Sequence, residues 1–233
     1  SRDTMPGVFW YWGAYSDLAS DVQAKCADNK ILTASVGPFS SVWDRACELF
    51  YQIKGGTVDY GQTHSERHGH ARYGRTFPGL YPEWDDNHPV HLVGHSMGGL
   101  TSRALVQMLV DRGAARGETT PLFSNIESEP MGSKCVKSVV TISTPHDGSP
   151  LVDEIDNVVP HIMELFEMGH RLLGVLGGSG QKFVYDYHLD QWGVEPRKQG
   201  EEYSEYERRV RSSPIWKDPP TDMCVFDLSP EVK

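Results

Sequence analysis

The feature that most constrains this chain is a predicted sharp turn at residues 94–98, which read Gly-His-Ser-Met-Gly. The apolar run Val90–Val93 precedes it and predicts a short strand. Residues 100–111 follow, and their apolar side chains recur at helical spacing, so a helix is expected there. A turn this tight needs small residues two positions before and two positions after its centre. We therefore expect the hydroxyl of Ser96 to project where a strand ends and a helix begins.

Strands and helices are expected to alternate along the chain, which is typical of parallel βαβ units. Residues 31–36 (Ile-Leu-Thr-Ala-Ser-Val) predict a short buried strand, and Ser40 or Ser41 can cap a helix that ends near Lys54. The β-branched run Val136–Ile142 predicts a further strand. The fold class is therefore predicted to be α/β, with a parallel sheet.

Size and charge exclude several classes of protein. The chain has 233 residues, which suits one domain with a sizeable core. Its formal net charge is −10, so the phosphate backbone of a nucleic acid would repel it. No stretch approaches about 18 consecutive apolar residues, and no transmembrane helix is predicted. Because no charged-then-apolar leader follows Ser1, we expect either that a targeting segment has been removed or that the chain is a fragment.

The cysteines carry little information about chemistry. The chain has 4 of them, far apart and without a Cys-x-x-Cys pair, so neither a thiolate zinc site nor a redox motif is predicted. Their spacing leaves open one disulfide or four free thiols. Cys47 falls on the apolar face of the helix expected to end near Lys54, and we interpret it as a core residue.

Residues 57–90 show no clean hydrophobic period and are rich in Gly, His, Arg and Tyr. They are interpreted as a long ordered loop or insertion. A loop of this length inside a compact domain usually needs a ligand or a metal to order it. The segment holds His64, His68 and His70, whose spacing fits either a metal site or a solvated loop without metal.

A broad apolar stripe runs along residues 151–176, with acidic residues on the opposite face, and predicts a helix that ends at the glycines of 177–180. The stripe fits a core helix and a mobile lid equally well. A polar helix is expected near Glu201–Arg211.

A serine at the junction of a strand and a helix is typical of a nucleophile in acyl transfer. Amides at the start of a helix point toward the same place, so the N–H of Met97 is expected to donate to a developing oxyanion. The serine also needs a base. His146 follows the strand Val136–Ile142, but the base normally comes from a later strand end, so we interpret His146 as part of a turn beside Ser96.

Six further stretches carry a resemblance to a known family: Val36–Ser41, Trp43–Glu48, Gly55–Gly61, His68–Thr76, Thr144–Gly148 and Leu189–Gly193. With residues 94–98 they resemble the secreted family I.5 bacterial lipases, the thermophilic Bacillus/Geobacillus and staphylococcal group. The resemblance implies an α/β-hydrolase, a parallel sheet flanked by helices. It also implies an extracellular enzyme that cleaves acylglycerols and simpler carboxylic esters at a lipid–water interface, without nucleic acid as a partner.

The resemblance also implies an inserted zinc subdomain over residues 57–89, a helical lid over 150–180 and a segment, 181–233, that returns to the zinc subdomain. It places the zinc ligands at four positions, which are Asp44, His64, His70 and Asp222. Imidazole and carboxylate suit Zn²⁺, and four protein ligands leave no open position for water, so the zinc is expected to be structural. His68 is left outside the ligand set.

The chain also departs from that family. Many relatives carry Gln where this chain has Met97, which matters little because the donor is a backbone N–H. The family's catalytic Asp and His, its calcium site and its second oxyanion donor are all expected outside residues 1–233. The chain is thus expected to be a single partial domain whose sheet is incomplete at both ends. We predict a serine-type lipase or esterase; the alternatives are a non-catalytic, zinc-stabilised fragment or pseudo-enzyme and an acyltransferase on the same scaffold.

Overall fold

The computed structural model describes residues 4–5, 9–10, 12, 17–26, 30–119, 122–123, 131–149, 188–195, 197–216 and 222–229. The helix expected over 151–176, and with it the lid expected over 150–180, lies outside the described residues. Within the described part no helix is long and apolar enough to cross a bilayer.

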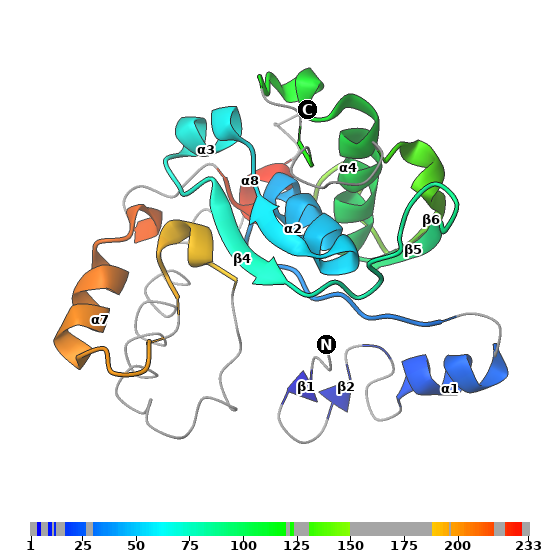
Figure 1. Cartoon of the computed structure of the whole chain (residues 1–233), viewed down its shortest axis with the longest axis horizontal. Coiled ribbons are helices and arrows are strands. Elements are labelled where there is room, and N and C mark those ends of the chain that lie inside the picture. Colours follow the sequence, from blue (N-terminus) through cyan, green and yellow to red (C-terminus); the bar gives the residue numbers. More distant parts are fainter. Residues whose placement is uncertain are drawn as a thin grey trace.

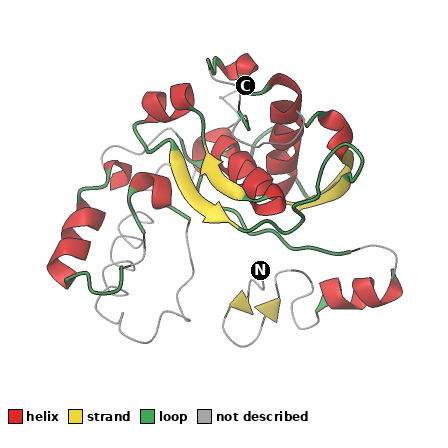
Figure 2. Ribbon diagram, in the orientation of Figure 1, coloured by secondary structure: helices red, strands yellow, loops and turns green. Residues whose placement is uncertain are grey.

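Helices and strands are interspersed over the described residues of 4–142 (Figures 1 and 2). The strands are β1 (Thr4–Met5), β2 (Phe9–Trp10), β3 (Gly56–Asp59), β4 (Tyr73–Phe77), β5 (Val90–His95) and β6 (Val136–Ile142). The helices are α1 (Leu18–Lys25), α2 (Val42–Lys54), α3 (Gln62–His68), α4 (Met97–Asp111), α7 (Tyr203–Arg211) and α8 (Cys224–Asp227). The described residues also include four short 3-10 helices: η1 (Ala114–Arg116), η2 (Ser133–Cys135), η4 (Asp190–Trp192) and η5 (Pro214–Trp216).

The centre of the fold is one parallel βαβ unit, as predicted. β5 and β6 pair in parallel, with Val93 opposite Val140, and α4 connects them. Leu92 and Gly94 of β5 are buried on one face, whereas Val93 and Val140 on the other face are 53% and 49% exposed among the described residues. The helix α4 begins earlier than predicted, at Met97, and the strand β5 extends further than predicted, to His95.

The strand predicted over residues 31–36 is wrong, because these residues have no regular secondary structure. The side-chain amide of Gln52 on α2 takes the place of a neighbouring strand. Its Oε1 accepts a hydrogen bond from the N–H of Ser35 at 2.9 Å, and its Nε2 donates to the carbonyl of Ser35. The N–H of Ile31 donates to the Oε1 of Gln23 at 2.7 Å. A strand needs the backbone of a partner, and an apolar run cannot reveal whether one is present.

The predicted start and end of helix α2 are both confirmed. The side chain of Ser41 accepts a hydrogen bond from the N–H of Asp44 and caps the start, and Gly55, with φ of +97°, ends the helix. Cys47 is fully buried in the core, as expected, beside Phe50, whose ring stacks on Phe123 at 3.8 Å. All 4 cysteines lie in the described part, and none forms a disulfide. Figure 1 shows α2 between the β3–β4 pair and α4.

Residues 57–90 contain more regular structure than the sequence predicted. β3 and β4 pair antiparallel, from Gly56 opposite Phe77 to Asp59 opposite Tyr73, and α3 lies in the connection between them. The guanidinium of Arg72 pairs with Asp59 through two hydrogen bonds, of 2.8 and 2.9 Å. These elements span only 4, 7 and 5 residues, too short to show a hydrophobic period.

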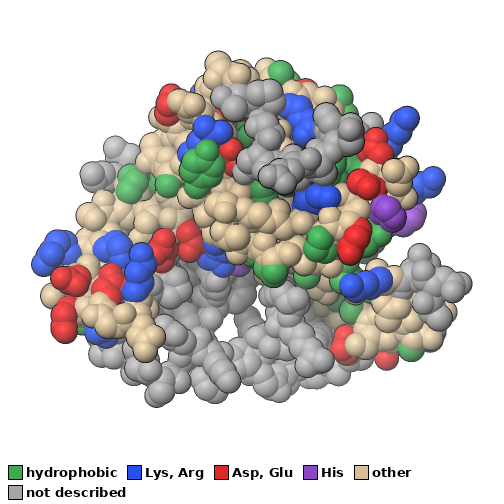
Figure 3. Space-filling model, in the orientation of Figure 1, with side chains coloured by type: hydrophobic (Ala, Val, Ile, Leu, Met, Phe, Trp, Pro, Cys, Tyr) green, Lys and Arg blue, Asp and Glu red, His purple; other side chains and the backbone are tan. Residues whose placement is uncertain are grey.

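The polar helix near residues 201–211 is confirmed as α7. Its buried side is small, because Tyr206 and Val210 are its two buried residues. The guanidinium of Arg209 pairs with Glu201 at 3.0 Å, and Arg211 pairs with Glu207 at 3.1 Å. Figure 3 shows basic and acidic side chains intermixed over this helix.

Candidate functional site

Two features of the described part are able to carry chemistry: the turn around Ser96 and a buried cluster of histidines and aspartates. The Ser96 turn (residues 94–98) joins the end of β5 directly to α4. Ser96 has φ of +53° and ψ of −127°, a backbone conformation that costs a non-glycine residue about 1–3 kcal/mol. Its N–H donates to the carbonyl of Ile142 on β6 at 2.9 Å, which fixes the strained residue to the neighbouring strand.

The two glycines of the Ser96 turn differ in their steric role. A side chain at Gly94 would place its Cβ 2.4 Å from the backbone carbonyl of Gly98, so glycine is needed there as predicted. At Gly98 a Cβ would meet no described atom within 4 Å, and the expectation of a steric need is wrong. The second close approach is at Gly99 instead, whose Cβ would lie 2.2 Å from the Oγ1 of Thr144.

The first backbone N–H groups of α4 lie next to Ser96, because Met97 directly follows it. The first N–H groups of any helix have no acceptor inside that helix, and the side chain of Ser96 does not cap this one. Met97 is the first residue of α4, so its N–H belongs to this group. Together with the helix dipole, such amides favour an anion close to the serine.

His146 lies in the turn after β6 with both ring nitrogens engaged. The guanidinium of Arg103 donates to Nδ1 at 2.8 Å, and the Oγ1 of Thr141 lies 3.2 Å from Nε2. Because a guanidinium has no acceptor, Nδ1 must accept, and the ring proton is on Nε2. This tautomer leaves no basic nitrogen free for Ser96, which supports the interpretation of His146 as part of a turn.

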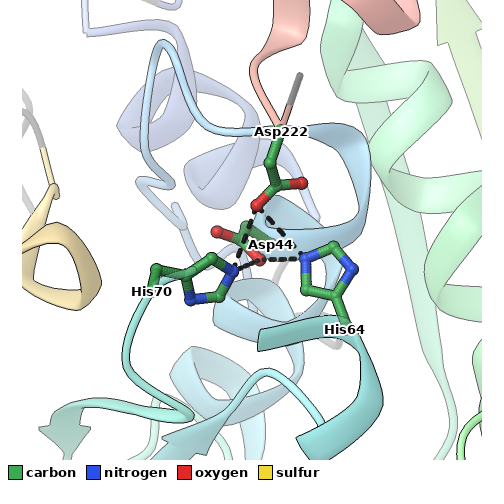
Figure 4. Close-up of side chains that lie close together, drawn as sticks. All are labelled: Asp44, His64, His70 and Asp222. Carbon is green, nitrogen blue, oxygen red and sulfur yellow. Dashed lines mark hydrogen bonds and ion pairs between the residues drawn. The ribbon is translucent and has the colours of Figure 1, made fainter. Parts of the chain in front are cut away.

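The His–Asp cluster consists of Asp44 on α2, His64 on α3, His70 after α3 and Asp222, two residues before α8 (Figure 4). One potential ligand atom from each residue lies within 4.8 Å of all the others. The Nε2 of His64 is 3.2 Å from an oxygen of Asp44 and 3.2 Å from an oxygen of Asp222. The Nε2 of His70 is 3.2 Å from the same oxygen of Asp222. The four residues predicted from the sequence are thus brought together.

His70 shows how well the cluster suits a cation. Its Nδ1 lies 2.9 Å from the carbonyl of Ala71, so Nδ1 carries the proton and Nε2 carries a lone pair. This Nε2 is buried and has no hydrogen-bond partner in the described part of the chain. A lone pair facing a carboxylate oxygen is repulsive unless a proton or a cation lies between them. Two carboxylates and two neutral imidazoles match the charge and the ligand preference of a divalent metal ion, and the cluster is able to hold one.

Without a metal, the charges in the cluster shift one another's protonation. Burial raises the pKa of Asp44, and the negative charge of Asp222 raises it further. Burial also opposes ionisation of Asp222, but the neighbouring imidazoles of His64 and His70, each 3.2 Å from its carboxylate, hold its pKa well below the ordinary value. Burial lowers the pKa of His64, yet hydrogen bonds with Asp222 and Asp44 outweigh it and raise the pKa to about 9. Positive charge inside the cluster is therefore strongly favoured.

Aromatic rings surround the imidazoles and limit their motion. The ring of Trp43 stacks on His64 at 5.0 Å, and its indole N–H donates to the carbonyl of Tyr60 at 2.7 Å. Trp192 packs against His70 at 4.9 Å. The ring of His68 contacts that of His64 at 4.6 Å, and His68 is not one of the four clustered residues.

Glu118 positions His64, a role that the sequence analysis missed. Its carboxylate accepts hydrogen bonds from the N–H groups of Thr63 and His64 at 3.1 and 2.6 Å, and so caps α3. Gly61, with φ of +91°, leaves room for it, because a Cβ there would lie 2.6 Å from the carboxyl group. Glu118 is 54 residues from His64, so no local capping pattern could have revealed it.

Comparisons with known proteins agree on one family. Residues 1–232 match the family described as "Lipase-like, C-terminal domain". Lipase 1 of Staphylococcus aureus (strain MRSA252) is 36% identical over 98% of this chain, and Lipase 2 of Staphylococcus aureus is 36% identical over 97%. Lipase 1 from Pelosinus fermentans is similar in structure, with a TM-score of 0.71, 41% identity and 100% of this chain covered. Staphylococcus hyicus lipase matches with a TM-score of 0.71, 35% identity and 95% covered.

The chain covers only part of the length of each of these relatives. It spans 33% of the S. aureus (strain MRSA252) Lipase 1 and 32% of Lipase 2. It spans 59% of the Pelosinus chain and 55% of the Staphylococcus hyicus chain. The similarity therefore concerns one part of each relative.

The geometry of the Ser96 turn predicts that Gly94→Ala is strongly destabilising. The new Cβ would overlap the rigid backbone of α4, so we expect a loss of about 3 kcal/mol or more. Gly98→Ala is the matched control, and its effect should stay within about 1 kcal/mol because nothing described lies near it. Urea denaturation of both variants measures the difference. Equal stability would contradict the tight turn.

The cap on α3 predicts that Glu118→Ala loosens His64. Two N–H groups lose their acceptor, so we expect the free energy of unfolding to fall by about 1–2 kcal/mol. Glu66→Ala is the control, since this exposed residue on α3 accepts a hydrogen bond only from the side chain of Gln62 in the described contacts. Its loss should be below about 0.5 kcal/mol in the same denaturation experiment. Equal losses would show that Glu118 does not cap the helix.

Proposed function

Because this chain belongs to the family of lipase-like C-terminal domains, we propose that it supplies the nucleophile of a lipase-type carboxylic ester hydrolase. The observation that carries the proposal is the strained Ser96 at the junction of β5 and α4, with the first amides of α4 beside it. The names of the relatives support the reaction class. The finer expectations belong to the same proposal: acylglycerols at a lipid–water interface, a lid over 150–180 and an extracellular location.

The proposed reaction follows from this geometry. The Oγ of Ser96 attacks the ester carbonyl carbon while a base accepts its proton, and the carbonyl oxygen becomes an oxyanion. The N–H of Met97 donates to that oxyanion, a contribution of about 3 kcal/mol in related chemistry. The tetrahedral intermediate expels the alcohol, whose oxygen receives the proton from the base, and an acyl-serine remains. Water then hydrolyses the acyl-serine. Since His146 is engaged by Arg103, we propose that the base comes from a part of the protein outside the described residues.

One observation favours a second candidate function. All four residues of the His–Asp cluster lie within the described part of the chain. The proposed base for Ser96, in contrast, lies outside the described residues. A non-catalytic, metal-stabilised domain would look the same. The two candidates differ in whether the whole protein activates Ser96.

Labelling with a fluorophosphonate distinguishes the two candidates. We expect the full-length protein to be labelled at Ser96, and Ser96→Ala to abolish the label. Ser138→Ala, which removes an exposed serine hydroxyl on β6 that bonds to His91, should leave it unchanged. Labelling that persists in Ser96→Ala, or a full-length protein that does not react, would reject the esterase proposal.

We further propose that the His–Asp cluster holds a structural zinc ion. Its two nitrogen and two oxygen donors suit Zn²⁺, and four buried protein ligands leave no position for a reacting water. A metal there would cross-link α2, the α3 region and the segment before α8. The calcium site implied by the resemblance is not part of this proposal.

Metal removal tests the zinc proposal. A ligand at about 100 times its Kd stabilises a protein by about 2.7 kcal/mol, so EDTA should lower the melting temperature by about 5–10 °C. His70→Ala should remove this sensitivity. His88→Ala is the control, because His88 is an exposed residue paired with Asp85, and it should keep the full response. An unchanged melting curve in EDTA, with no zinc found by metal analysis, would show that the site does not exist.

A further inference from the structure

A side chain outside the ligand set contacts the His–Asp cluster directly. Gln191, in η4, is 2% exposed, and its Nε2 donates to the Oδ2 of Asp44 at 2.8 Å. The other oxygen of Asp44, Oδ1, is the one that lies 3.2 Å from His64. Each oxygen of this carboxylate thus has its own role, one toward the cluster and one toward Gln191.

Packing alone does not explain a glutamine at this position. The Oε1 of Gln191 is buried and has no hydrogen-bond partner in the part of the chain that the structure describes. Burying an unpaired amide oxygen costs about 1–3 kcal/mol, so an apolar side chain of the same length would pack at lower cost. The hydrogen bond to Asp44 is what the glutamine adds.

The turn that carries Gln191 is held in place by contacts with the segment around His70 and with Ser213. The carbonyl of Gln191 accepts a hydrogen bond from the N–H of Ala71 at 2.9 Å, next to His70. The ring of Trp192 packs on His70 at 4.9 Å. The side chain of Ser213 donates to the carbonyl of Trp192 at 2.6 Å and holds the turn from the other side. Gln191 is therefore held rigidly where it meets Asp44.

We propose that Gln191 is a positioning residue of the metal site, which holds Asp44 as a ligand through one oxygen only and joins residues 188–195 to the bound metal. This inference rests on the proposed metal function. A carboxylate whose second oxygen is free can rotate and offer both oxygens to a cation, whereas a hydrogen bond to Oδ2 prevents the rotation. A neutral amide does this without adding a positive charge that would compete with the cation.

The test compares metal binding by variants of the full-length protein. Gln191→Met keeps the length and the apolar volume but cannot donate, so we expect zinc affinity, measured by competition with a chromophoric chelator, to fall about 10- to 100-fold. With Co²⁺ in place of zinc, we expect the visible absorption band to weaken and shift, because Asp44 is free to add a second oxygen. Gln191→Glu keeps the shape, places a carboxylate against Asp44, and should weaken the affinity at least as much.

Two controls separate positioning from general destabilisation. Gln52→Met removes another buried glutamine, which lies about two helical turns along α2 from Asp44 and bonds to Ser35. Ser213→Ala loosens the same turn without touching Asp44. Both should lower the melting temperature and leave the Co²⁺ spectrum unchanged. A wild-type protein that binds no metal would reject the metal site itself. A folded Gln191→Met variant with wild-type zinc affinity and Co²⁺ spectrum would reject only the role of Gln191. If the Gln191→Met variant does not fold, wild-type zinc affinity and Co²⁺ spectrum in Gln191→Glu would reject that role.

Discussion

The structure depends on the burial of two carboxylates, Asp44 and Asp222, within 3.2 Å of the same imidazole nitrogen of His64. Two negative charges in one buried site repel each other and lose their hydration, so they stay together only where positive charge lies between them. Protons on the histidines or a divalent cation can supply that charge. As a consequence, the start of α2, the α3 region and the segment before α8 meet at one point, although they are far apart in the sequence.

Helix α2 connects this cluster with the Ser96 turn. Arg45, the residue after Asp44, donates from Nε to the Oγ1 of Thr101 at 3.0 Å, and Thr101 donates to the carbonyl of Met97 at 3.1 Å. The guanidinium of Arg45 also donates to the carbonyl of Gly37 at 2.7 Å. The helix that carries Asp44 thus also contacts the first turn of α4. A cross-link at the cluster would therefore hold α2, against which α4, the helix that follows Ser96, packs.

Features formed by residues close together in the sequence could be predicted, whereas features formed between distant segments could not. The Ser96 turn and the ends of α2 were predicted because a cap, a stop and a tight bend are formed by residues within a few positions of one another. The strand over residues 31–36 was wrong, since an apolar run does not reveal whether a neighbouring backbone is available. The β3–β4 pair was missed because its strands are too short and too polar to show a period.

By itself, the sequence determined the alternation of strand and helix around Ser96, which is read from residue identity and spacing, and, through its resemblance to a known family, which four side chains meet at the His–Asp cluster. Only the tertiary structure decided what holds those side chains in place. Glu118 caps the helix of His64 from 54 residues away, and Gln191 reaches Asp44 from 147 residues away. A hydrogen bond depends on distance in space, and separation along the chain carries no information about it once the fold has brought two segments together.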